Sequence, residues 1–437
     1  MQIKSLCSLA VMALFAGCGG GGGSDGGTSP QPVEPVAKKA PALCPTNDNG
    51  ANYDCPAMSG FNGDESTTIS TQGNARVERI EFAQLHLKQP DSQYFVAVAN
   101  RDALIRVVVT ADAGQNNLKA PALKLTLTNQ DTGVQVMQTT LHPATSQMVL
   151  PITGDAVDAA RGNTTVPDFY RSYLYRLPAA NLPAANLPAA NLQLKAEIDT
   201  IASGLQDSVF IDNAKVVNLK PVAVPTLKLV TVPIQVSGTV PKMPNPDFIR
   251  KLMSKYLPIS DVQIRQHEPF IVADWVFNGV KPADYQGGWF VSLGRINWDT
   301  QGGEFALLPQ QESNNSEHYV GFVNGRAGGS TNPQSGTIVM QDELAYEPDY
   351  AVLPHEFLHV LNFPHDKACG ATLGLDQPDV YPYPNGGLGG VWGIEINENA
   401  TRISLKSPAK YSSLMGYCVN RFTSDYHAYE FVNRFRQ

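Results

Sequence analysis

The chain has 437 residues, of which 43% are hydrophobic and 16% are charged, and its formal net charge is -8. A chain of this length exceeds the usual size of one domain and allows two or three, each able to bury its own core. Because no excess of basic residues exists to hold nucleic acid or an anionic lipid surface, the composition argues against a nucleic-acid partner.

The amino terminus has the pattern of an export signal. Residues 1–17 carry a lysine near the start, then an apolar run and two small residues before Cys18. This segment is too short to span a bilayer stably as a helix. The stretch LFAGC also resembles a bacterial lipobox, in which Cys18 becomes the lipidated first residue of the mature chain. We therefore expect an exported cell-envelope lipoprotein with outer-membrane sorting, whose membrane contact is the anchor at Cys18, or a secreted protein if the signal is only cleaved.

Residues 18–62 predict a flexible tether with a small cysteine loop. A Gly/Ser stretch passes into a Pro-rich one, and this composition cannot bury a core. With Cys7 in the signal and Cys18 lipidated, four of the six cysteines remain in a chain destined for an oxidising compartment. Cys44 and Cys55 are our candidates for a local disulfide, although four cysteines allow three connectivities and the sequence alone does not choose.

Residues 63–220 predict a β-rich domain. Runs such as ARVERIEFAQLHL and ALKLTLTN alternate or cluster apolar residues and are separated by Asn, Asp, Gly and Pro, which favours an antiparallel sandwich. The five-residue unit LPAAN occurs three times between Leu177 and Asn191. Its recurring prolines prevent a regular helix, so we expect a loop there.

Residues 221–437 show a mixed α and β pattern. Strands are predicted at TLKLVTVPIQV, WFVSLGRI, HYVGFVNG and GTIVM. NPDFIRKLMSKYL predicts an amphipathic helix that opens with an Asn cap and an early proline. The fold class expected for the whole chain is therefore multidomain α+β, with an N-terminal antiparallel β-sandwich-like domain followed by an α/β domain.

The stretch HEFLHVLNFPH, His355–His365, has the spacing of a catalytic zinc site on a helix predicted to begin near Tyr350. His355 and His359 lie on the same helix face, so their rings can converge on one metal ion. Glu356 is offset by about 100° and can reach a metal-bound water, which is the position of a general base.

A third ligand requires the chain to turn back after the helix. His365 can reach the metal if Asn362, which tolerates a left-handed conformation, and Pro364, which cannot continue a helix, form that turn. Three neutral imidazoles leave a fourth position open for water, as in catalytic zinc sites. An alternative ligand set replaces His365 by a downstream glutamate, Glu395 or Glu398. The remaining histidines are predicted to be surface or packing residues: His86, His142, His267, His318 and His427.

This stretch resembles the signature of the metzincin metalloproteases, HExxHxxGxxH followed downstream by a Met-turn, with Asn362 in place of the glycine. SLMGY matches the Met-turn, which implies that Met415 forms a hydrophobic floor beneath the metal. Tyr417 matches a tyrosine that approaches the zinc or the oxyanion in some families, while ordinary packing is its competing role. Segments such as YPYPNGGLGGVWGIEI, SLMGYCVNRFTSDYHAYEF and RVERIEFAQLHL resemble secreted or lipid-anchored bacterial metzincins related to the StcE-type mucin-cleaving proteases.

The resemblance implies a metzincin-type catalytic domain at residues 221–437 with one catalytic Zn²⁺ ion. The implied function is a zinc-dependent endopeptidase that hydrolyses extracellular proteins, O-glycosylated mucin-like glycoproteins among them. Zinc-activated water would attack the peptide carbonyl, with Glu356 as general base and Tyr417 at the oxyanion. An extended substrate would lie along an edge strand, for which our candidate is GFVNGRAGG, Gly321–Gly329. The alternative function is a catalytically inactive surface adhesin, a lipoprotein that binds glycoproteins.

A second disulfide is predicted near this site. Cys369 follows His365 by four residues, and Cys418 follows Met415 by three. A bond between them would tie the segment of the third ligand to the Met-turn. We therefore predict the pairs Cys44–Cys55 and Cys369–Cys418.

Overall fold

The structure, a computed structural model, describes most of the chain beyond residue 68. The described residues are 44–46, 69–115, 117–143, 148–152, 159–161, 164–166, 171–183, 191–199, 213–272, 293–297, 304–314, 316–325, 328–342, 351–371, 380–396 and 402–436. They all belong to one compact unit, Ala42–Gln437. The predicted signal, the anchor at Cys18 and the partner Cys55 lie outside the described residues. Within the described part, no helix has the length and apolar character needed to cross a membrane.

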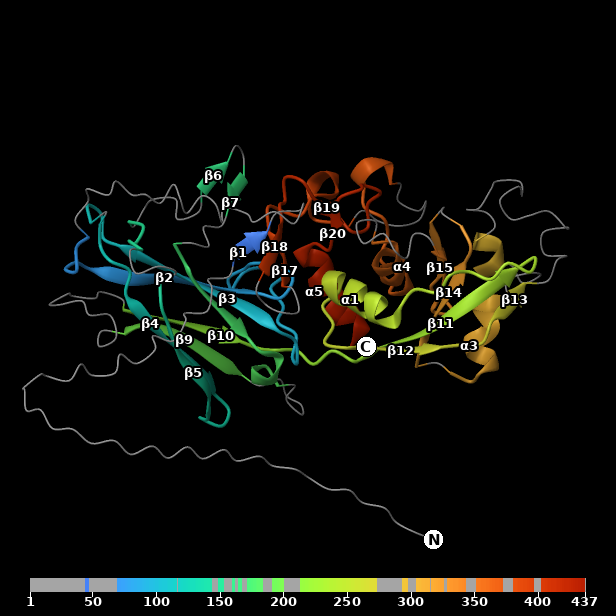
Figure 1. Ribbon diagram of the computed structural model, residues 1–437, viewed down its shortest axis with the longest axis horizontal. Helices are drawn as coiled ribbons and strands as arrows, with labels where there is room; N and C mark the ends of the chain where they lie inside the picture. The colour runs from blue at the N-terminus through green and yellow to red at the C-terminus, as the bar shows by residue number, and fades with distance from the viewer. Residues whose placement is uncertain are drawn as a thin grey trace, which may run out of the picture. The chain divides into compact units, whose positions relative to one another are not determined.

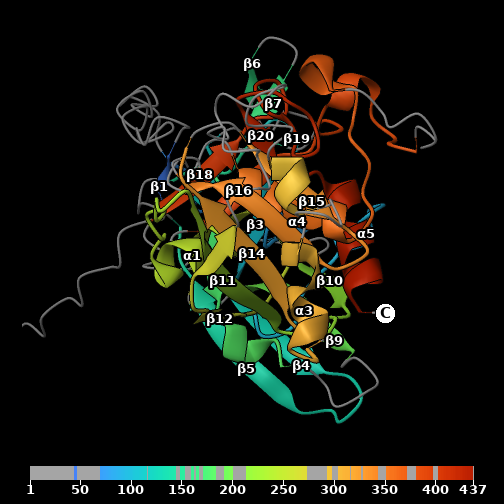
Figure 2. The same cartoon turned by 90° about the vertical axis from the view of Figure 1, so that its right-hand side faces the viewer.

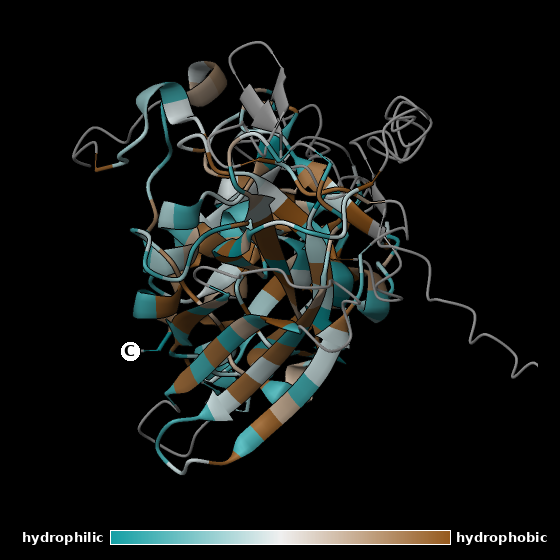
Figure 3. Ribbon diagram, turned by 90° about the vertical axis from the view of Figure 1, so that its left-hand side faces the viewer, coloured by the Kyte–Doolittle hydropathy of each residue, from teal (hydrophilic) through white to brown (hydrophobic). Residues whose placement is uncertain are grey.

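The first half of the described chain is a sandwich of two antiparallel sheets (Figure 1). One sheet has the order β2-β3-β8, formed by Ala75–Ala83, Ala103–Ala111 and Tyr173–Leu177. The other has the order β10-β9-β4-β5, formed by Ala214–Leu219, Leu192–Asp199, Ala122–Asn129 and Gln135–Leu141. Leu125 of β4 and Leu194 of β9 share a core with Ile105 of β3. Figure 3 shows the resulting alternation of hydrophobic and hydrophilic bands along the strands. The predicted antiparallel β-rich fold is thereby confirmed.

A small sheet, with two of its three strands from the C-terminal part of the chain, covers the outer face of this sandwich. Its order is β1-β18-β17, formed by Cys44–Thr46, Arg402–Lys406 and Gly393–Ile396. Leu104 of β3 and Ala83 of β2 pack against Trp392 and Leu405 in a separate small core. Because β3 is covered on both sides, all nine of its residues are buried. The sandwich and the C-terminal residues are therefore packed together.

The second half is built on a largely parallel sheet of order β12-β11-β14-β16-β15, seen in Figure 2. Its strands are Val262–Gln266, Leu227–Val236, His318–Val323, Thr337–Gln341 and Gly329–Asn332, and β13, Phe270–Val272, also pairs with β11. Only β15 runs antiparallel, at one edge. The predicted edge region Gly321–Gly329 is wrong for β14, which lies between β11 and β16. An apolar run such as HYVGFV is typical of a strand covered on both faces.

Helices cover both faces of this sheet. On one face lie α1, Pro246–Tyr256, the motif helix α4, Val352–Val360, and α5, Asp425–Phe435. The predicted start of α1 is confirmed, since the Asn245 side chain accepts a hydrogen bond from the backbone N–H of Asp247 at 2.8 Å. The short helix α3 is Leu308–Gln311. The remaining short elements are β6 and β7 (Ala159–Arg161, Thr164–Val166), β19 and β20 (Ser412–Ser413, Arg421–Phe422), and single turns at Ala179–Asn181, Glu304–Leu307, Ala368–Gly370 and Pro384–Gly386.

The strand predicted at WFVSLGRI is wrong in its described part. Residues 293–297 are helical. Leu293 and Ile296 are both fully buried against the second face of the sheet, and a spacing of three residues places them on one helix face. The spacing of this apolar pair is therefore helical. The other bulky apolar residues of WFVSLGRI make the segment resemble a strand.

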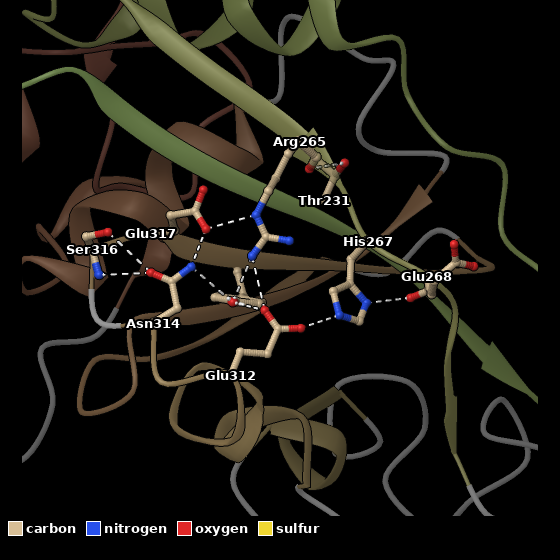
Figure 4. Close-up of polar contacts among 9 residues, drawn as sticks. Thr231, Arg265, His267, Glu268, Glu312, Asn314, Ser316 and Glu317 are labelled. Atoms are coloured by element: carbon tan, nitrogen blue, oxygen red, sulfur yellow. Dashed lines mark hydrogen bonds and ion pairs between the residues drawn. The ribbon is translucent and has the colours of Figure 1, made fainter.

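A network of charged side chains lies at the β12 edge of the sheet, opposite the β15 edge (Figure 4). Arg265 donates from Nε to Glu317 at 2.9 Å and from Nη2 to Glu312 at 3.1 Å. The hydroxyl of Tyr319 also donates to Glu312, while the ring nitrogens of His267 face the Glu312 carboxylate and a backbone carbonyl. Because Arg265 occupies the space between the two carboxylates, the cluster joins β12 to β14 and α3 and does not offer a cation site.

Candidate metal centre

Three imidazoles come together, two of them on α4 and the third beyond the turn that follows it. One ligand atom from each of His355, His359 and His365 lies within 4.8 Å of the others, and this group could hold a metal ion. The Nε2 atoms of His359 and His365 are 3.0 Å apart. Two nitrogen ligands at about 2.05 Å from a tetrahedral zinc ion are separated by about 3.3 Å. The nitrogen separation therefore fits a shared metal ion.

The hydrogen bonds of the first two rings leave the correct nitrogen for a metal. Nδ1 of His355 lies 2.7 Å from the carbonyl oxygen of Leu414, and Nδ1 of His359 lies 2.8 Å from that of Phe363. Because a carbonyl only accepts, each Nδ1 carries the proton and each Nε2 keeps a lone pair. Burial lowers the pKa of His359, and burial with nearby positive charge lowers the pKa of His355 well below its usual value. Both rings are therefore neutral, and each can offer the lone pair of Nε2 to a metal ion.

The predicted turn after α4 is confirmed. Asn362 has a φ of 58°, its N–H donates to His359 O at 2.9 Å, and the N–H of Phe363 donates to Leu358 O at 3.1 Å. This pair of bonds is the Schellman ending of a helix. Arg434 of α5 donates to the carbonyls of Leu361 and Asn362 at 3.0 and 2.9 Å. The turn that brings His365 back toward the helix is thus stabilised by its own backbone hydrogen bonds and by Arg434 of α5.

The segment Ser413–Cys418 is bonded to residues that carry the imidazoles and to their neighbours. The carbonyl of Leu414 accepts the hydrogen bond from His355, and the carbonyl of Met415 accepts one from the N–H of Asp366 at 3.1 Å. The N–H of Tyr417 donates to Ala368 O at 3.1 Å, and Met415 is fully buried. The predicted disulfide Cys369–Cys418 is present. The segment of the third histidine is therefore joined to the segment of Met415 by hydrogen bonds and by a covalent bond.

Glu356 is a buried carboxylate beside the three imidazoles. It is 7% exposed, and the hydroxyl of Thr331 donates to its Oε2 at 2.6 Å. Burial raises the pKa of Glu356 to about 7, against the opposing effects of the Thr331 bond and the positive charge of Arg421. A carboxyl group with a pKa near neutrality is suited to accept a proton and to return it.

Tyr417 lies at the open side of the group. Its hydroxyl is 3.3 Å from Nε2 of His365, and the residue is 51% exposed. Burial of its hydroxyl and the charge of Glu356 raise its pKa, so the phenol stays protonated at neutral pH. Tyr417 is therefore not a packed core residue, and its hydroxyl is available as a hydrogen-bond donor.

A cleft of about 830 Å³ opens onto these groups. The three histidines, Glu356 and Tyr417 form one wall, and residues of β15, among them Thr331, form another. Arg421, 7% exposed, also lines the cleft and donates to Gly416 O at 3.2 Å. Sequence reasoning missed Thr331 and Arg421, because neither belongs to a local motif and both reach the cleft only through the fold.

The alternative ligand Glu395 lies elsewhere in the fold. Its carboxylate pairs with Lys255 at 3.3 Å and Lys406 at 3.5 Å, and the metal group among the described residues does not include it. Glu398 lies outside the described residues. Of the other histidines, His86 and His427 are buried, and His142 is exposed. His267 belongs to the network of Figure 4, and burial lowers the pKa of His318 to about 4.

Comparison with known proteins adds no family. No protein-family model matches the chain, and no curated protein matches it in sequence. The geometry of the site is therefore the basis on which a function is assigned.

Proposed function

We propose that this protein is a zinc-dependent endopeptidase with a metzincin-type site. The observation that carries the proposal is the convergence of three imidazoles, two of them held neutral, beside a buried carboxylate that lines the same open cleft. Three nitrogen donors with a free fourth position are the ligand set of catalytic zinc. Structural zinc sites are instead closed by four protein ligands.

His355, His359 and His365 would hold the ion. When bound, zinc supplies Lewis-acid chemistry, since it polarises a carbonyl oxygen and makes water acidic enough to react near neutral pH. Glu356 takes a proton from the attacking water and returns it to the leaving amine, for which its raised pKa is suited. Tyr417 donates a hydrogen bond to the carbonyl oxygen as negative charge develops there.

The edge strand β15 is the proposed binding site for the backbone of a peptide substrate. It is four residues long, lies at the end of the sheet and lines the cleft beside Glu356. An extended peptide can add to such an edge by main-chain hydrogen bonds, which bind without selecting a particular side chain. This arrangement supports an endopeptidase acting on extended protein segments.

The location and substrates proposed follow from the sequence. The export signal and Cys18 support a lipid-anchored cell-envelope or secreted enzyme. An exported enzyme meets extracellular proteins. We include O-glycosylated mucin-like glycoproteins among them, on the resemblance of the chain to mucin-cleaving metzincins.

The test is cleavage of unstructured casein and of an O-glycosylated mucin, with zinc measured in the same samples. Glu356→Gln removes the proton acceptor and keeps the shape, so this variant should bind zinc and lose cleavage. Glu395→Gln is the matched control and should cleave as the native chain does, because Glu395 pairs with two lysines away from the metal group. Zinc binding without cleavage of either substrate by the native chain would reject the endopeptidase and favour the adhesin.

A further inference from the structure

Thr331 connects the edge strand β15 to Glu356. Its hydroxyl lies 2.6 Å from Oε2 of Glu356 and 3.0 Å from the backbone oxygen of the same residue. Thr331 is 8% exposed, so water does not compete freely for this bond. A hydroxyl has one proton to donate, and the shorter contact assigns it to the carboxylate.

Gly329 places the backbone of the same strand against Glu356. A methyl group at Gly329 would lie 2.6 Å from Cγ and 2.7 Å from Oε1 of Glu356, closer than packed atoms approach. Gly329 and Thr331 are two residues apart, so their side-chain positions face the same side of β15. The carboxylate thus lies against the strand at Gly329 and is held by the hydroxyl at Thr331.

The backbone N–H and C=O groups of these two residues lie in the plane of the sheet and point toward its open edge. The N–H of Gln341 donates to Gly328 O at 3.1 Å, and Gly329 stands opposite Met340 in the antiparallel pair. Hydrogen-bonded and non-hydrogen-bonded residues alternate in such a pair. Gly329 and Thr331 therefore turn their N–H and C=O groups away from β16. Among the described residues, no strand pairs with that side of β15.

We propose that Thr331 is the positioning residue of Glu356, and that it ties the carboxylate to the strand on which a peptide substrate pairs. This inference rests on the proposed function. The backbone of Thr331 meets the peptide, whereas its hydroxyl sets the position of the group that moves the proton. Loss of the hydroxyl should consequently lower kcat and leave KM nearly unchanged, because the strand that binds the peptide is intact.

The experiment compares the full protein with Thr331→Val, which keeps the shape, and Thr331→Ser, which restores a hydroxyl. Thr126→Val, on the outer face of the sandwich sheet, is the matched control. Crystal structures should show the Glu356 carboxylate displaced in the Val variant and in place in the Ser variant. Since a hydrogen bond to a charged group is lost, kcat on casein should fall roughly 10- to 100-fold in the Val variant. The Ser variant should recover most of that loss, with zinc content equal throughout.

Two results would overturn the assignment. One is a Val variant whose Glu356 carboxylate occupies its native position, and the other is a Val variant with the kcat of the native protein. If the Val variant does not fold, Thr331→Ala serves the same comparison. A native protein that cleaves neither casein nor mucin rejects the proposed function, while the crystal structures still decide whether Thr331 holds Glu356.

Discussion

Asn362 occupies the position on which the return of His365 to the helix depends. Its φ of 58° lies in the left-handed region, and its side chain is exposed. Substitution therefore changes the backbone preference at this residue and removes little packing. Comparison of Asn362→Gly, Asn362→Ala and Asn362→Val isolates the cost of the left-handed conformation.

The magnitudes follow from the conformation. Glycine adopts a positive φ without strain, and its greater freedom in the unfolded chain costs about 0.4 to 1 kcal/mol. The Gly variant should thus lie within about 0.5 kcal/mol of the native protein, because relief of strain offsets this cost. Alanine should cost about 1 kcal/mol and valine about 2 kcal/mol or more, since a β-branched side chain is least compatible with a positive φ.

The assay is denaturant unfolding of each zinc-saturated variant at one fixed free zinc concentration. Under this condition the free energy of unfolding includes the cost of the turn, whether it weakens the fold or the metal site. The expected order of stability is Gly close to Asn, then Ala, then Val. A Val variant as stable as the Gly variant would refute the account of the turn.

Three further predictions concern the support of the site. Replacing Cys369 and Cys418 by Ser opens a loop of 49 residues and should lower the free energy of unfolding by up to about 4 kcal/mol; an unchanged denaturation midpoint would contradict this. Burial lowers the pKa of His86 to about 4 and of His427 to about 3. The unfolded chain therefore binds protons below about pH 6.5 that the folded chain refuses, and stability should fall as the pH drops from there toward 3. His86→Gln should make that slope shallower in acid denaturation, and an equal slope would remove this explanation. Phe357→Ala empties a fully buried position on the core-facing side of the motif helix and should lower the free energy of unfolding by about 3 to 5 kcal/mol, measured against Tyr429→Ala at an exposed position.

The sequence predicted those elements whose pattern is local. The alternation in β4 and the Asn245 cap of α1 each depend on neighbouring residues, and the structure has them as expected. The edge strand β15, with the sequence GSTN, has no apolar periodicity. Its strand conformation comes from pairing with β16, and pairing between strands is context that a local pattern does not contain.

The residues of the site also divide into those predicted from local spacing and those brought there only by the fold. His355, Glu356 and His359 occupy one turn of a helix, so their spacing alone predicted their convergence. His365 was predicted through the left-handed turn at Asn362, which is again local. Thr331 reaches Glu356 across 25 residues of sequence, and an isolated threonine in a polar strand carries no sign of that contact.

In the proposed site, three histidines and no glutamate hold one zinc ion. Metal analysis of the purified native chain, His365→Ala and Glu395→Gln tests it directly. We predict about one zinc per chain in the native protein and in Glu395→Gln, and loss of zinc in His365→Ala, since two imidazoles alone leave the ion without its third protein ligand. Full zinc content in His365→Ala, or none in the native chain, would contradict the account.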